Sequence, residues 1–129
     1  MCGIAGIFHL SATESPSRDT LVEMTQAFHY RGPDEEGYHV GPGVGLGIRR
    51  LAIVDIKHGQ QPMYSEGRDL VSVCNGEIYN HVALRQTLEQ AGHRFNTRCD
   101  VEVIIPMYRE YGLDCIKQFN GQFGFALYD

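Results

Sequence analysis

Long apolar runs are missing from this 129-residue chain, and none approaches the ~20 residues that a membrane-spanning helix needs. The amino terminus also lacks the basic segment and long apolar stretch of a secretory signal, so the sequence predicts a soluble, cytoplasmic chain. Lys and Arg are few and scattered. Eleven of them against sixteen Asp and Glu give a net charge of −5, which leaves no basic patch for a nucleic-acid backbone. Neither a membrane nor a nucleic acid is expected as a partner.

Metal-ligand and nucleotide signatures are absent as well. The six histidines never occur at metal-binding spacing with one another or with a cysteine, and the four cysteines form no C-x-x-C pair. Residues 41–47 are rich in glycine, but the Gly-Lys-Ser/Thr ending of a phosphate loop is missing and no helix is expected to follow. The sequence therefore predicts neither a metal site nor a nucleotide site. In a reducing compartment Cys74, Cys99 and Cys115 are expected to be free core residues.

The length fits one domain, in which strand-like and helix-like segments alternate without a linker. Apolar residues at helical spacing predict a helix from 17 to about 29, and two further helices are expected to start at caps Asn80 and Asp100. These should end near Gly92 and Gly112, with a kink at Pro106. The remaining expectations are a loop at 11–16 and strands at 3–10, 37–40, 44–48, 51–55, 70–74 and 123–128. The strands between 37 and 74 are expected to share one sheet.

Cys2 is the residue with the most suggestive placement. If Met1 is removed, Cys2 becomes the amino terminus, and one residue then carries both a nucleophile and a base. A thiol has an intrinsic pKa near ~8.5 and an α-amine one of roughly 7.7 to 8.0, so this amine can accept the thiol proton near neutrality. The alternative is a small apolar residue that opens a buried strand.

A second feature is the Asn75-Gly76 pair. Asn-Gly is a strong hairpin signal, but a helical pattern rather than a second strand follows Tyr79. We therefore expect a turn that ends a strand, where the Asn75 carboxamide and the next backbone N–H point at one spot. Such a pair of donors stabilises the oxyanion that forms when a nucleophile adds to a carbonyl.

Several motifs in this chain, taken together, resemble the glutaminase domain of glutamine-dependent asparagine synthetase, a class II glutamine amidotransferase. They are Cys2-Gly3-Ile4-Ala5-Gly6-Ile7, Arg31-Gly32-Pro33-Asp34, Arg50-Leu51-Ala52-Ile53-Val54-Asp55, Gln61-Pro62-Met63, Asn75-Gly76-Glu77-Ile78-Tyr79-Asn80 and Asp100-Val101-Glu102-Val103-Ile104. The resemblance runs from residue 1 to residue 129. It implies an α+β fold of the N-terminal nucleophile hydrolase type, a four-layer αββα sandwich with antiparallel sheets. The periodicity of the sequence indicates only mixed α and β structure.

The resemblance also implies roles for individual residues. Cys2 matches the nucleophile, with its own α-amine as base, and Asn75 and Gly76 match the oxyanion hole. Arg50 matches the arginine that binds the α-carboxylate of glutamine, a task suited to a planar fork. Glu77 and Asp100 match positions that recognise the α-amino group. Without the resemblance, Glu77 could equally be a solvated charge and Asp100 a helix cap.

The family further implies a glutaminase domain that continues beyond residue 129, followed by a synthetase domain. Residues 1–129 are thus expected to be a partial glutaminase domain, incomplete at its carboxyl end, with no cofactor of its own. ATP and magnesium would belong to the absent synthetase domain. The expected partners are glutamine, the synthetase domain of the full-length protein and a second copy in a homo-oligomer. The alternative function is that of a non-catalytic fragment or partner-binding module.

Overall fold

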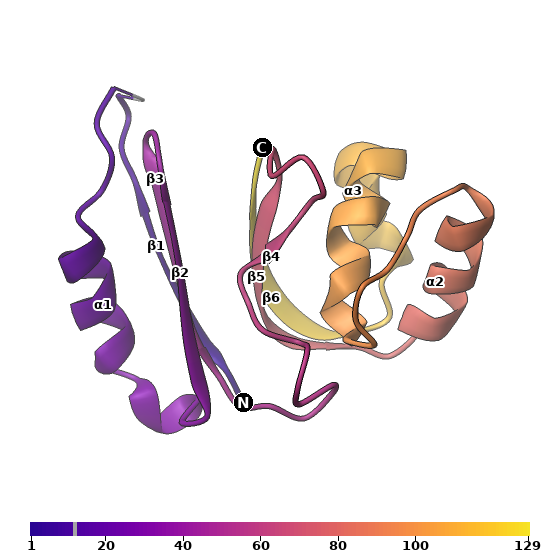
Figure 1. Cartoon of the computed structure of the whole chain (residues 1–129), viewed down its shortest axis with the longest axis horizontal. Coiled ribbons are helices and arrows are strands. Elements are labelled where there is room, and N and C mark those ends of the chain that lie inside the picture. Colours follow the sequence, from indigo (N-terminus) through magenta and orange to yellow (C-terminus); the bar gives the residue numbers. More distant parts are fainter. Residues whose placement is uncertain (12) are drawn as a thin grey trace.

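The computed structural model describes residues 1–11 and 13–129 and arranges them in four layers (Figure 1). One helix covers the outer face of a first sheet, a second sheet faces the first, and a layer of two helices lies on the outer side of the second sheet, one against the sheet and one farther out. This is the αββα order expected from the resemblance. Ala12, inside the loop expected at 11–16, lies outside the described residues. In the described part of the chain, no helix is long and apolar enough to cross a membrane.

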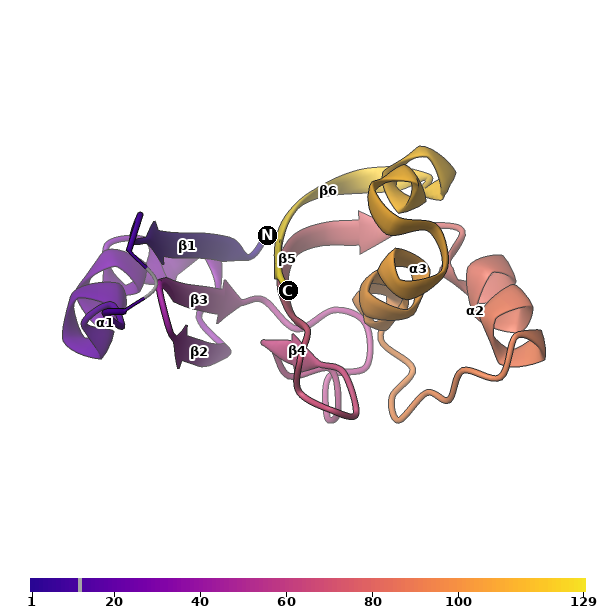
Figure 2. The ribbon, with the colours of Figure 1, turned by 90° about the horizontal axis from the view of Figure 1, so that it is seen from above.

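The first sheet has three antiparallel strands in the order β1-β3-β2, which Figure 2 shows from above. Helix α1 packs on its outer face and starts at Ser17, whose Oγ accepts the N–H of Thr20 at 3.3 Å. A 3-10 turn, η1, follows this helix. The bounds are β1 Gly3–Phe8, α1 Arg18–Gln26, η1 His29–Arg31, β2 Glu35–Gly41 and β3 Val44–Arg50.

Successive residues of β3 face opposite sides of the strand, which explains how both faces of β3 are covered. Val44, Leu46 and Ile48 are buried and face the second sheet. Between them lie glycines that face α1, and a Cβ on Gly47 would come within 2.8 Å of the Thr25 side chain. Glycine at this position therefore lets the helix lie close against the strand.

The second sheet is also antiparallel, in the order β4-β5-β6. Its central strand directs Val71 and Val73 toward the first sheet, and Cys74 and Ile78 toward the helices. The bounds are β4 Met63–Tyr64, β5 Val71–Ile78, α2 His81–Gln90, η2 Asp100–Val103, α3 Ile104–Tyr111, η3 Gly112–Gln118 and β6 Gly121–Tyr128. The helices of this half close the larger of two apolar cores, in which Leu88, Ile104 and Met107 are almost fully buried.

Two expectations about the strands are wrong. The strands between 37 and 74 do not share one sheet, because β2 and β3 pair with β1 whereas β5 pairs with β4 and β6. Residues 51–55 are not a strand. The guanidinium of Arg50 binds the carbonyl oxygens of Val54 and Asp55 at 2.9 and 3.0 Å, and these contacts fold the segment into a loop.

The Asn75-Gly76 pair is not a turn, and this expectation too is wrong. Both residues lie inside β5 and pair with Gly124 and Phe123 of β6. Gly76 has φ of +149°, and a Cβ there would overlap the carbonyl oxygen of Gln122. The glycine is therefore required by a close backbone approach within the sheet rather than by a hairpin turn.

The expected helix caps also differ from the structure. Neither Asn80 nor Asp100 makes a capping hydrogen bond. Asn80 precedes α2, but its side chain binds the main chain at Gln118 and Asn120, and the Asp100 carboxylate accepts the N–H of Ile78 in β5. Pro106 lies in the first turn of α3, where a backbone N–H has no partner within the helix. In place of one kinked helix, the segment forms η2 and then α3. It ends at Gly112, as expected.

His39 is expected to make the stability of the sandwich depend on pH. Its ring lies between the sheets beside Tyr64 and Tyr128, and burial together with the charge of Arg68 lowers its pKa. The unfolded chain therefore binds more protons than the folded chain between the lowered pKa and the ordinary value of about 6.5. The free energy of unfolding should fall as the pH drops through this window.

Urea unfolding at pH 7.5 and 5.5 measures this effect. His39→Gln should reduce the loss of stability between the two pH values, whereas His29→Gln, which changes an exposed histidine, should leave the loss unchanged. Equal losses in the wild type and in His39→Gln would rule out this role for His39.

Candidate active site

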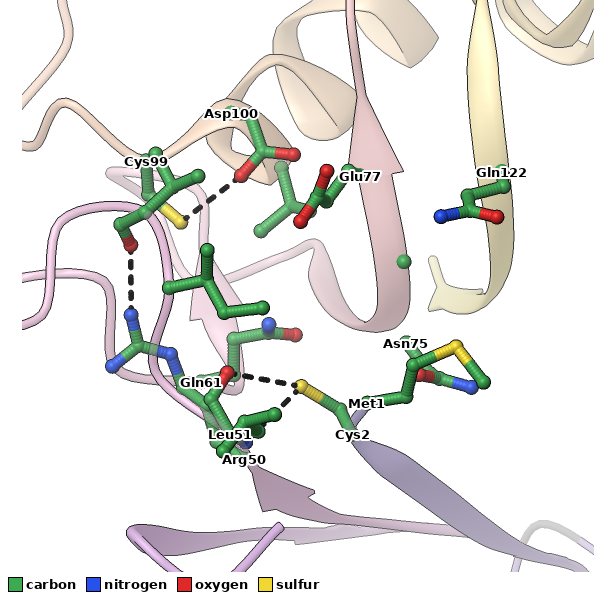
Figure 3. Close-up of a pocket in the computed structure, with 14 residues that line it drawn as sticks. Met1, Cys2, Arg50, Leu51, Gln61, Asn75, Glu77, Cys99, Asp100 and Gln122 are labelled. Atoms are coloured by element: carbon green, nitrogen blue, oxygen red, sulfur yellow. Dashed lines mark hydrogen bonds between the residues drawn. The ribbon is translucent and has the colours of Figure 1, made fainter. Parts of the chain in front are cut away.

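A cavity lies at one end of the sandwich, where the apolar contacts between the sheets give way to polar side chains (Figure 3). The residues that line the cavity follow from the alternation of inward and outward side chains along the strands. Cys2 precedes β1 on the same face as Ile4, and Asn75 and Glu77 continue the inward face of Val71 and Val73. The sequence-predicted residues Cys2, Arg50, Asn75, Gly76, Glu77 and Asp100 all line this one cavity.

The sulfur of Cys2 is held by the loop that follows β3. The backbone N–H of Leu51 donates to Cys2 Sγ with an N···S distance of 3.3 Å, and Sγ lies 3.7 Å from the carbonyl oxygen of Leu51. Arg31 Nε donates to the Cys2 carbonyl at 3.0 Å. The thiol is half-buried and lines the cavity. The contact with Leu51 fixes the position of the sulfur at the cavity.

Arg50 is 3% exposed and is held on several sides. Its Nη1 donates to Glu35 at 2.6 Å, and Nη2 donates to the carbonyls of Val54 and Asp55. A weaker contact of 3.4 Å joins Nη1 to the Ile56 carbonyl. Among the described residues Nε has no hydrogen-bond partner. An anion that binds Arg50 must therefore use Nε or compete with Glu35.

Asn75 brings a carboxamide to the cavity, which Met1 also lines. Its Oδ1 is buried and has no hydrogen-bond partner among the described residues. A buried polar atom without a partner costs free energy, and such atoms concentrate where a ligand supplies the missing contact. Asn75 and Gly76 are thus adjacent on β5 at the cavity, although they are not in the turn that the sequence suggested.

Two carboxylates complete the polar side of the cavity. Asp100 is 4% exposed, and its Oδ2 accepts the N–H of Ile78 at 2.8 Å. Cys99 Sγ lies 3.7 Å from the other carboxylate oxygen, Oδ1. Glu77 is half-buried and also lines the cavity. Together they give the cavity negative charge on the side formed by β5 and η2, and Arg50 contributes positive charge from β3.

The other cysteines are buried and free, as expected. Burial raises the pKa of Cys74 to about 12, with a further contribution from the charge of Asp100. Burial and Asp100 likewise raise the pKa of Cys99 to about 12, and burial raises the pKa of Cys115. These thiols stay protonated near neutral pH, so they cannot act as nucleophiles there.

The sequence did not indicate Gln61 or Gln122 as site residues, although both line the cavity. Gln122 lies opposite Glu77 in the pairing of β5 with β6. The alternation of β6, in which Ala126 and Tyr128 face the first sheet, could have placed Gln122 on the inward face. Gln61 belongs to a loop and has no strand alternation to place it, and its signal was its membership of the motif Gln61-Pro62-Met63.

Comparison with known proteins identifies the family. The family model described as "Glutamine amidotransferase domain" matches residues 1–129. The chain belongs to this family. Asparagine synthetase [glutamine-hydrolyzing] 2 of Bacillus subtilis (strain 168) is 42% identical over 131 residues, which cover 100% of this chain and 17% of that protein. The chain spans about a fifth of the length of the curated relatives it matches, with shares of 17%, 21% and 22%. The resemblance to the glutaminase domain of asparagine synthetases is confirmed.

Solved structures agree on the fold of this amidotransferase domain. Glutamine phosphoribosylpyrophosphate amidotransferase from B. subtilis aligns with a TM-score of 0.54 at 22% identity over 68% of this chain and 21% of its own. The structure described as the allosteric regulatory enzyme of purine biosynthesis aligns with a TM-score of 0.57 at 19% identity. That alignment covers 96% of this chain and 29% of the other. The expected N-terminal nucleophile hydrolase-type αββα fold is confirmed.

Proposed function

We propose that this chain hydrolyses the side-chain amide of glutamine to glutamate and ammonia through a thioester on Cys2. The observation that carries the proposal is the convergence of Cys2, Asn75-Gly76, Arg50 and two carboxylates on one cavity. The family match and the names of the glutamine-hydrolysing relatives support it.

The proposed chemistry begins with Cys2 after removal of Met1. The α-amine takes the thiol proton, and the sulfur adds to the δ-carbonyl carbon of glutamine. The carboxamide of Asn75 and the N–H of Gly76 stabilise the resulting oxyanion. Collapse of this intermediate breaks the C–N bond, and the leaving ammonia takes the proton from the amine. Water then cleaves the thioester, which releases glutamate and restores the thiol.

Selectivity for an amino acid follows from the charges at the two sides of the cavity. Glu77 and Asp100 supply negative charge for the α-amino group, and Arg50 supplies positive charge for the α-carboxylate. Because Glu35 already binds Arg50 at 2.6 Å, the substrate carboxylate joins or displaces an existing ion pair rather than meeting a free cation. Glutaminase assays with glutamine and with analogues that lack the α-amino group or the α-carboxylate test this selectivity. Turnover of either analogue equal to that of glutamine would contradict the proposal.

Arg50→Lys should weaken glutamine binding more than it slows the chemical step. A lysine supplies a point charge where arginine supplies a fork, so KM should rise roughly tenfold or more while kcat changes less. Arg109→Lys is a matched control, since Arg109 also binds a carboxylate with two hydrogen bonds, but outside this cavity. A large loss in kcat with unchanged KM in Arg50→Lys would contradict the assignment.

The wider role is also a proposal. We propose that residues 1–129 act as the glutaminase part of an asparagine synthetase-like protein in the cytoplasm, and that ammonia passes to a synthetase domain that forms an amide on aspartate. ATP and magnesium would be needed by that domain and not by this one. Within the described residues, no group of three or more His, Cys, Asp or Glu side chains could hold a metal ion. Self-association into a homo-oligomer would show in the sedimentation of the purified chain.

A further inference from the structure

Gln61 hydrogen-bonds to the main chain of β5 immediately before Asn75. Its Oε1 accepts the N–H of Cys74 at 2.6 Å, and its Nε2 donates to the carbonyl of the same residue at 3.2 Å. Gln61 is 9% exposed and lines the cavity. Both backbone groups of Cys74 on this edge of the strand are therefore held by one side chain.

The register of the second sheet explains why a side chain occupies this place. Met63 lies opposite Ser72 and Tyr64 opposite Val71, so the same antiparallel register puts residue 61 opposite Cys74. Pro62 lies between Gln61 and the first residue of β4. It has no N–H to donate to a neighbouring strand, and β4 begins only after it. The carboxamide of Gln61 offers one donor and one acceptor, as a peptide group does, and takes the place of the missing backbone partner.

The main chain of Gln61 lies directly against the other sheet. A Cβ on Gly37 in β2 would overlap the carbonyl oxygen of Gln61, so glycine at that position allows the loop to lie directly against the first sheet. Gln61 thus connects β2 of the first sheet to β5 of the second at the rim of the cavity. Through these contacts, Gln61 holds the part of β5 that carries Asn75 at a fixed distance from the first sheet.

The Cys74 carbonyl is part of the peptide group that joins Cys74 to Asn75. Holding this carbonyl fixes the plane from which the Asn75 side chain leaves the strand. Asn75 Oδ1 has no hydrogen bond among the described residues, so that atom does not anchor the carboxamide. On the basis of the proposed function, we infer that Gln61 is a positioning residue, which sets the Asn75 carboxamide and the Gly76 N–H for the oxyanion formed on the glutamine substrate.

Gln61→Met removes both hydrogen bonds at similar side-chain length and adds no charge. Displacement of oxyanion donors affects the transition state rather than the bound substrate, so kcat for glutamate release should fall about tenfold to a hundredfold with KM changed less than about threefold. The rate of Cys2 alkylation by iodoacetamide, a reaction without an oxyanion, should stay near that of the wild type. Gln86→Met, on the exposed face of α2, is the matched control.

Gln61→Glu provides a second test with a pH-dependent readout. The ionised carboxylate can accept from the Cys74 N–H but faces the Cys74 carbonyl without a donor, whereas the protonated acid can make both hydrogen bonds. The ratio of variant to wild-type kcat should therefore rise as the pH is lowered from 8 toward 6, because burial raises the pKa of the introduced carboxyl. Gln86→Glu should show a ratio near one at every pH.

These outcomes separate the inference from the function on which it rests. A Met1-free wild-type chain that releases no glutamate overturns the proposed function and the positioning role of Gln61 together. An active wild type with unchanged kcat in both Gln61 variants, or with the loss confined to KM, overturns the inference alone. If the variants do not fold, NMR of the wild type decides. A scalar coupling across the hydrogen bond from the Cys74 nitrogen to the Gln61 carboxamide carbon is expected, and its absence overturns the inference.

Discussion

Cys2→Ala is expected to reduce glutamate release from glutamine by at least about a thousandfold, because the proposed thioester cannot form without the sulfur. Replacing the thiol removes one half-buried atom that touches Leu51, so the fold should remain intact. Glutamate release and far-UV circular dichroism of the purified variant measure the two expectations.

Cys115→Ala is the control for this variant. Cys115 is 2% exposed in η3 and does not line the cavity, so its replacement should lower stability while activity persists. Unchanged glutamate release from Cys2→Ala would eliminate Cys2 as the nucleophile. Equal losses in both variants would indicate general damage to the fold.

Retention of Met1 is expected to abolish activity as completely as loss of the sulfur. While Met1 is attached, the nitrogen of Cys2 belongs to a peptide bond, whose resonance removes the basic lone pair. The structure adds a second reason, because Met1 itself lines the same cavity as Asn75 (Figure 3). A retained Met1 would thus both block the base and occupy space near the oxyanion donors.

Treatment of Met1-containing protein with methionine aminopeptidase provides the measurement. Glutaminase activity should appear in parallel with the mass loss of one methionine residue, while iodoacetamide should alkylate Cys2 both before and after treatment. Full activity in a sample whose intact mass still includes Met1 would refute the α-amine as base.

The sequence predicted local structure well where short-range chemistry decides it. The helical spacing of apolar residues after residue 17 placed α1 close to its observed bounds, and Gly112 ended α3 as expected. Prediction failed where the partner is distant in sequence. Nothing local distinguishes β3, which pairs with the amino-terminal β1, from β5, which pairs with β6 some fifty residues later.

At the cavity, too, prediction failed where the structure depends on partners outside the local sequence. Asn75-Gly76 has the local signature of a turn, but pairing with Gly124 and Phe123 keeps both residues in the strand. The segment at 51–55 has strand-like composition, but contacts from the side chain of Arg50 fold it into a loop. Motif resemblance supplied the six candidate residues that the structure brings together. It included Gln61 in the motif Gln61-Pro62-Met63 but implied no role for that residue, whose position depends on the register of β4 and β5.

Labelling of the Met1-free chain with 6-diazo-5-oxonorleucine, a glutamine analogue with an electrophile at the δ-carbon, tests the central claim most directly. Cys74, Cys99 and Cys115 serve as internal controls, since burial keeps their thiols protonated. Intact mass and peptide mapping should reveal a single adduct on Cys2, and excess glutamine should slow its formation. The absence of an adduct on Cys2, or labelling that glutamine does not slow, would contradict glutamine hydrolysis at this cavity.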